Sequence, residues 1–155
     1  MTNDRPRPDH APLDPERLRL LIDGFNANNR PHFGGHLGYR LVDARHGWAR
    51  LEVECRTEHL NPAGVMHGGA SFGLADSAVA AALITIYGTG FALLTIEMKI
   101  NYLEPIPTGL VVAEASVLRS SRRSAYAEVD VWAGGKLAAR ASTTYMIKPL
   151  ATVPG

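Results

Sequence analysis

The residues best suited to chemistry lie where a glycine-rich loop meets a long apolar segment. Asn61-Pro62-Ala63-Gly64 leads into His67-Gly68-Gly69, and Asp76 follows inside the apolar segment. The first N–H groups of a helix have no partner within it and lie at the positive end of its dipole. Because glycine has no side chain, a ligand oxygen can approach these amides closely. The junction therefore suits polarisation of a carbonyl group, as in an oxyanion hole, or else simply close packing of the helix.

Asp76 is the second candidate. Its neighbours Leu74, Ala75 and Ala78 are apolar. Burying an unpaired carboxylate costs several kcal/mol, so an aspartate at such a position needs either a function or good partners. The functional interpretation is a general base. The structural alternative is an aspartate bonded to Ser77 or to a strand hydroxyl.

The spacing of these residues has a geometric consequence. His67 and Asp76 are nine positions apart, which on a helix places them on opposite sides and about 13 Å apart along the axis. One chain cannot easily bring both to a single reacting atom. A two-fold dimer can, because the helix start of one subunit then meets Asp76 of the other. If both act, the site is shared between subunits.

Two further sets of residues are candidates for binding. Asn61 precedes a proline, which makes it either a turn residue or an amide that holds a water or a carbonyl. Arginines and serines cluster at one predicted hairpin: Arg119, Ser120, Ser121, Arg122, Arg123 and Ser124. Arginine binds phosphate groups bidentately, although exposed basic turns are also commonly just solvated.

The elements that position these residues can be predicted from periodicity. Asp14-Pro15 starts a first helix, which Asn28, Asn29 and Pro31 end, and the run His32–Gly35 is predicted as a loop. The apolar segment to Tyr87 is predicted as a buried core helix, since a membrane span would not carry Asp76. Six runs alternate with period two: 38–43, 48–56, 95–102, 110–118, 125–132 and 137–147. Short turns between them indicate an α+β fold with an antiparallel sheet around the central helix.

In the third of these runs, the alternation places Ile96, Met98, Ile100 and Tyr102 on the apolar face. Thr95 then falls on the opposite, polar face together with Glu97.

Composition narrows the function classes. The chain has 155 residues, of which 46% are hydrophobic and 20% charged, and a formal charge of +1. This predicts one globular domain over residues 14–150, after a disordered leader (1–13) and before a short tail (151–155), and argues against a nucleic-acid or membrane-surface binder. The one cysteine, Cys55, excludes an internal disulfide framework and a CxxC metal site. No secretory signal is visible, and a cytoplasmic location is expected.

Two segments together resemble a known family. NPAGVMHGGASFGLADSA followed by LLTIEMKINYLEPIPTG is similar to the hotdog-fold acyl-CoA thioesterases of the phenylacetate-degradation (PaaI-like) type, and the similarity extends over about residues 36–147. The resemblance implies an antiparallel sheet wrapped around one long helix, and homodimers that pair into homotetramers. It implies an acyl-CoA substrate and no separate cofactor or metal.

The resemblance also implies roles for individual residues. Asp76 matches the catalytic carboxylate, as general base or nucleophile. The Gly68 amide matches the donor that polarises the thioester carbonyl, with His67 supporting the turn. Asn61 matches the asparagine that orients water or substrate, and Thr95 a hydroxyl that helps hold the water.

Binding of coenzyme A is implied for Gly69 and for the hairpin residues Arg119, Ser120, Arg122, Arg123 and Ser124. Two alternatives stay open, because one fold serves several activities. One is a hotdog-fold hydratase or dehydratase, although an aspartate rather than a histidine on the helix favours hydrolysis. The other is a non-catalytic acyl-CoA-binding protein.

Overall fold

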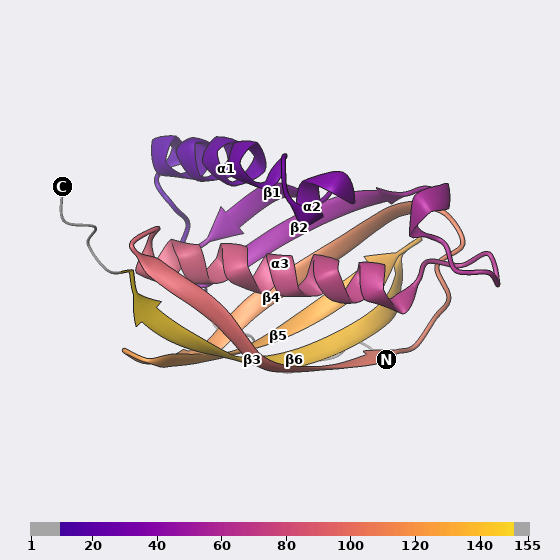
Figure 1. Cartoon of the computed structure of the whole chain (residues 1–155). Coiled ribbons are helices and arrows are strands. Elements are labelled where there is room, and N and C mark those ends of the chain that lie inside the picture. The colour runs from indigo at the N-terminus through magenta and orange to yellow at the C-terminus, as the bar shows by residue number, and fades with distance from the viewer. Residues whose placement is uncertain (1–9, 151–155) are drawn as a thin grey trace.

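A curved antiparallel sheet wraps around one long helix in the computed structural model, which describes residues 10–150 (Figure 1). The helices are α1 (Pro15–Asn29), α2 (Phe33–His36) and α3 (Gly68–Tyr87), with a short 3-10 turn at Thr57–His59. The strands are β1 (Arg40–Arg45), β2 (Trp48–Cys55), β3 (Phe91–Tyr102), β4 (Gly109–Ser120), β5 (Ser124–Ala133) and β6 (Lys136–Pro149). The predicted α+β architecture is confirmed.

The strand order is β1-β2-β4-β5-β6-β3, and every neighbouring pair is antiparallel. The chain leaves the sheet after β2, runs through α3, and returns to the far edge as β3. Consequently β3 pairs only with β6, and its other edge is free within the described chain. An unpaired strand edge is a ready template for pairing with another chain.

Helix α3 is the core of the fold. It is long and apolar enough to cross a membrane by length and composition alone, but most of it is buried against the sheet. The helix packs mainly on β2 and β4, and its fully buried residues are small or branched, among them Leu74, Ala78 and Ala82. Small alanine side chains let the sheet approach the helix closely, so the predicted core helix is confirmed.

The N-terminal part covers one end of the sheet. Asp14 caps α1 by accepting from the N–H groups of Glu16 and Arg17, as the Asp-Pro pair predicts. The Asn26 side chain then bonds both the N–H and the C=O of Leu41. This ties α1 to the edge strand β1, above which it lies in Figure 1.

The sequence predicts a loop over His32–Gly35, but Phe33–His36 forms the short helix α2, which packs on α1 and α3. That prediction is wrong because tertiary packing overrides the low helix propensity of two glycines. Most of the predicted leader (1–9) and the tail (151–155) lie outside the described residues. Residues 10–13 are described and hydrogen-bond to the β1–β2 turn, where Ala11 accepts from the N–H of His46.

The predicted alternation in β3 is also wrong at one position. The register between β3 and β6 shifts between Thr95 and Glu97, so Ile96 is an extra residue in a β-bulge. Ile96 is 60% exposed instead of buried, whereas Met98 and Ile100 still pack on the core. The bulge reverses the alternation on one side, and Thr95 therefore faces α3 instead of lying on the polar face.

Candidate active site

The start of α3 is built as an N-cap that leaves one amide open. His67 is the cap residue, and its Nδ1 accepts a hydrogen bond from the N–H of Gly69 at 2.9 Å. This bond lies in the turn that the family resemblance implies His67 supports, and it occupies the Gly69 amide. Among the described residues, no acceptor is found for the N–H of Gly68. Gly68 therefore presents a free donor at the positive end of the helix dipole.

Close packing explains why position 68 is glycine. The Tyr102 hydroxyl donates to the Gly68 carbonyl at 2.8 Å. A Cβ at position 68 would lie 2.9 Å from Cζ of the Tyr102 ring. Burial raises the pKa of Tyr102, which favours its role as a donor. Both alternatives in the sequence, a free amide and close packing, thus apply to the same glycine.

Asn61 borders the same region. Its Oδ1 accepts from the N–H of Ala63 at 2.9 Å, a turn interaction that corresponds to the first of the two interpretations of Asn61 from the sequence. Within the described part of the chain, its Nδ2 makes no hydrogen bond. Asn61 and Gly68 line one pocket of about 390 Å³ together with Tyr102 and Ile106. The two residues that carry an open N–H donor therefore line the same pocket.

A buried histidine holds this loop in place. The ring of His59 is 1% exposed, accepts at Nδ1 from the N–H of Arg56, and has its Nε2 2.9 Å from the carbonyl of Leu37. Its own carbonyl accepts from the N–H of His67 at 2.7 Å. No sequence motif points to this role of His59, because its partners are backbone groups from separate segments.

Asp76 lies halfway along α3 and is held by two hydroxyls. Its Oδ1 accepts from Thr95 Oγ1 at 2.8 Å and from the Tyr145 hydroxyl at 2.5 Å. Among residues 10–150, no donor is found for Oδ2. Asp76 is half-buried, and it has the good hydrogen-bond partners that its apolar neighbours require of a structural aspartate. Its contacts with strand hydroxyls match the structural alternative, while the open Oδ2 can accept a proton from a water molecule.

Tyr145 is a residue that sequence reasoning missed. It is 2% exposed, and burial together with the charge of Asp76 raises the pKa of its phenol. The phenol therefore keeps its proton and donates it to the carboxylate in a hydrogen bond. No sequence motif marks this tyrosine, because it lies in an ordinary strand. Its role becomes visible only from the sheet register, which places it opposite Thr95.

Within one chain, the two halves of the candidate site stay apart. Gly68 and Asp76 lie eight positions apart on α3, which is about 12 Å along the axis. Gly68 faces Tyr102 and Asn61, whereas Asp76 faces Thr95 and Tyr145. Within the described part of a single chain, Asn61 thus lies near Gly68 and Thr95 lies near Asp76, but these two pairs are separate from each other.

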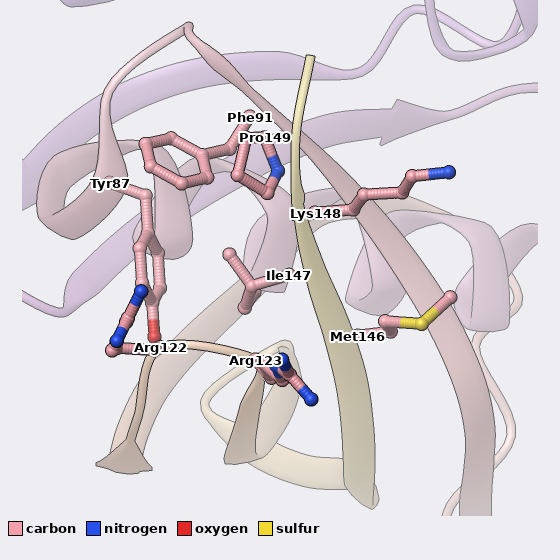
Figure 2. Close-up of a pocket in the computed structure, with 8 residues that line it drawn as sticks. All are labelled: Tyr87, Phe91, Arg122, Arg123, Met146, Ile147, Lys148 and Pro149. Carbon is pink, nitrogen blue, oxygen red and sulfur yellow. The ribbon is translucent and has the colours of Figure 1, made fainter. Parts of the chain in front are cut away.

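The basic hairpin contributes to a separate pocket of about 620 Å³ (Figure 2). Of the predicted residues, Arg122 and Arg123 line it, whereas Arg119, Ser120 and Ser124 do not. Lys148 adds a third cation, and Tyr87 and Phe91 add an aromatic pair with ring centroids 5.8 Å apart. The remaining lining residues are Met146, Ile147 and Pro149.

The hairpin turn is fixed from both sides. The Tyr87 hydroxyl donates to the carbonyl of Ser121 at 2.7 Å, and the Ser121 side chain bonds Ser124 across the turn. Ser124 therefore supports the turn that carries the two arginines. Among the described residues, no group of three or more His, Cys, Asp or Glu side chains could hold a metal ion.

Known proteins share both the sequence pattern and the fold. Residues 63–139 match the family described as the Thioesterase superfamily. Acyl-coenzyme A thioesterase 13 from Homo sapiens is 33% identical over 107 residues, which is 67% of this chain and 76% of that protein. The chain belongs to the thioesterase superfamily.

Other relatives agree with this assignment. A putative esterase from Archaeoglobus fulgidus is 36% identical over 90 residues, and the chain matches 56% of its length. A mutant of the phenylacetic acid degradation protein PaaI from Thermus thermophilus superposes with a TM-score of 0.68 at 33% identity, covering 74% of this chain and 96% of that one. The PaaI-like resemblance, the hotdog fold and the identification as a thioester hydrolase are confirmed.

The segment that matches the superfamily contains only part of the candidate site. It includes Gly68, Asp76 and Thr95, but begins after Asn61 and ends before Tyr145. In this thioesterase, the two hydroxyls that bond Asp76 thus come from Thr95 inside the matched segment and from Tyr145 outside it.

Proposed function

We propose that this protein hydrolyses the thioester bond of an acyl-CoA or aryl-acetyl-CoA to the free acid and CoA. Asp76 serves as general base or nucleophile, and the Gly68 amide polarises the thioester carbonyl. The observation that carries the proposal is the carboxylate of Asp76, with Oδ1 held by two hydroxyls and Oδ2 open. The proposal needs no metal or cofactor, since CoA takes part only as the thiol half of the substrate.

Two routes are compatible with an open Oδ2. In the base route, Oδ2 takes a proton from water, the hydroxide adds to the carbonyl carbon, the C–S bond breaks, and the CoA thiolate takes up a proton. In the nucleophile route, Oδ2 adds to the carbonyl carbon, CoA leaves as the thiolate, and water hydrolyses the resulting anhydride. Negative charge develops on the carbonyl oxygen in both routes. An amide donor at Gly68 that stabilises this charge therefore accelerates either reaction.

The proposed site is formed by two subunits. A polarised carbonyl lies within about 3 Å of its donor, and a base acts directly or through one water. The separation of about 12 Å between Gly68 and Asp76 along α3 exceeds this reach. A two-fold partner can place its Gly68 and Asn61 opposite Asp76, which would give two equivalent sites per dimer.

The free edge of β3 is the surface that we assign to this partner, a second copy of the same chain. Leu94 and Ile96 on β3 are 45% and 60% exposed, and Met146 on the neighbouring strand is 42% exposed. Thr95, which holds Asp76, lies between the first two. A copy that covers this edge would therefore lie next to Asp76. Pairing of such dimers into tetramers and a cytoplasmic location belong to the same proposal.

We place the nucleotide end of CoA in the pocket of Arg122, Arg123 and Lys148. These cations suit the phosphate groups, and the rings of Tyr87 and Phe91 offer apolar surface to a base. Tyr87 follows Asp76 by eleven positions on α3, about 16 Å along the axis. The extended pantetheine arm of CoA is of comparable length.

The test is release of CoA thiol, measured over a panel of short-chain, long-chain and aryl acyl-CoAs. We expect turnover of at least one class, and a loss on the order of 10²-fold or more in Asp76→Asn, which keeps the size of the side chain but removes the base. The exposed Asp23 on α1 offers a matched control, and Asp23→Asn should keep full turnover.

Two outcomes would contradict the proposal. Wild-type turnover in folded Asp76→Asn would remove Asp76 from the mechanism. Binding of acyl-CoAs without thiol release, or loss of an enoyl-CoA double bond instead of thiol release, would favour the binding protein or the hydratase.

A further inference from the structure

Two hydroxyl groups converge on one oxygen of Asp76. Thr95 Oγ1 and the Tyr145 hydroxyl both donate to Oδ1, at 2.8 and 2.5 Å. The Tyr145 oxygen also lies 3.0 Å from the backbone carbonyl of Asp76. One phenol thus contacts both the side chain and the main chain of the same residue, and this fixes the carboxylate relative to the axis of α3.

The sheet builds this arrangement from two strands. Thr95 on β3 and Tyr145 on β6 are directly opposite each other in the register, so their side chains point to the same face. That face is covered by α3. Tyr145 is 2% exposed, so its ring is held in place by surrounding atoms.

We propose that Tyr145 is a positioning residue for hydrolysis: with Thr95 it holds Oδ1 of Asp76, so that Oδ2 alone faces the water or the thioester. This rests on the role proposed above for Asp76. A carboxylate has two equivalent oxygens and rotates about its Cβ–Cγ bond. Two donors on one oxygen remove that freedom and leave a single oxygen for proton transfer or attack.

Substitution of the hydroxyl alone tests the proposal. Tyr145→Phe keeps the ring that fills the core and removes only the donor. We expect kcat to fall about tenfold with KM within about twofold, because the acting group loses orientation while the binding surfaces stay intact. Thr95→Val should have a smaller effect of the same kind, and Thr95→Ser should restore kcat.

A second tyrosine supplies the matched control. Tyr39 is also 2% exposed, and its hydroxyl donates to the Ala70 carbonyl of α3 at 2.7 Å. Tyr39→Phe therefore removes the same kind of buried bond to the same helix without touching Asp76. It should lower the melting temperature about as much as Tyr145→Phe and leave kcat unchanged. Equal kcat values in the two variants would overturn the proposal.

A double-mutant cycle separates this proposal from the role of Asp76 itself. In the Asp76→Asn background the acting oxygen is already lost, so Tyr145→Phe should cause no further loss of kcat. If Asp76→Asn is inactive and Tyr145→Phe still lowers its residual kcat tenfold, Tyr145 acts independently of Asp76 and the positioning role is wrong. If Asp76→Asn is fully active, the proposed function of Asp76 fails instead.

Discussion

A mixture of two inactive variants should regain activity if each active site takes residues from two subunits. The first variant is Asp76→Asn. The second is Gly68→Pro, which removes the amide hydrogen at the first position of α3, where proline is compatible with the helix. The new ring would meet the Tyr102 ring, but this residue is 53% exposed and can move aside. Each variant alone should be nearly inactive.

The size of the recovery follows from the distance along α3. Because Gly68 and Asp76 are about 12 Å apart on one helix, each shared site takes its amide from one subunit and its carboxylate from the other. A mixed dimer then has one intact site and one site with both defects. Random exchange of equal amounts makes about half of the dimers mixed, so about one quarter of the wild-type thiol release per dimer should return.

The experiment requires proof of exchange. Subunits carrying two different affinity tags are mixed, and mixed dimers are isolated by sequential purification; the isolated species should show about half of the wild-type turnover. A site contained within one chain predicts no recovery, since every chain in the mixture is defective. Isolated mixed dimers without activity would therefore refute the shared site.

Further predictions concern the nucleotide pocket and the buried phenols. Arg122→Ala and Arg123→Ala should raise KM for acyl-CoA more than they lower kcat. The same variants should hardly change hydrolysis of a short thioester that lacks the nucleotide. Equal effects on both substrates would indicate a folding role instead. Burial raises the pKa of Tyr39 and Tyr145 above the ordinary value of 10.0. The contribution of each phenol to the free energy of unfolding is therefore complete below pH 10. Above pH 10 it falls by about 1.4 kcal/mol per pH unit, because the phenol ionises in the unfolded chain but stays protonated in the folded one. Chemical denaturation between pH 9 and pH 11 measures this slope, which Tyr39→Phe should reduce.

Most of the fold follows from local patterns. The Asp14-Pro15 start, the six strand-like runs and the apolar run before Tyr87 each depend on neighbouring residues, and the structure forms a helix or a strand at each of them. Two exceptions are α2, which forms through contacts with α1 and α3, and the bulge at Ile96, which depends on the pairing of β3 with β6. No local pattern contains either.

The candidate site could be predicted only in part. Asn61, His67, Gly68 and Asp76 lie within sixteen positions, and their order is a motif. The groups that hold them come from remote segments. Tyr145 reaches Asp76 across 69 positions, so the contact depends on the sheet register and on the path of the chain between them.

The bulge at Ile96 shows how one residue connects the carboxylate to the proposed partner surface. Side chains of a regular strand alternate with a period of two, so Thr95 and Met98, three positions apart, cannot both face α3. The structure requires both, because Thr95 bonds Asp76 and Met98 packs on the core. One extra residue resolves the conflict, and that residue, Ile96, is turned outward at the free edge of β3. The same irregularity that brings a hydroxyl to Asp76 thus exposes an apolar side chain where a second copy would complete the site.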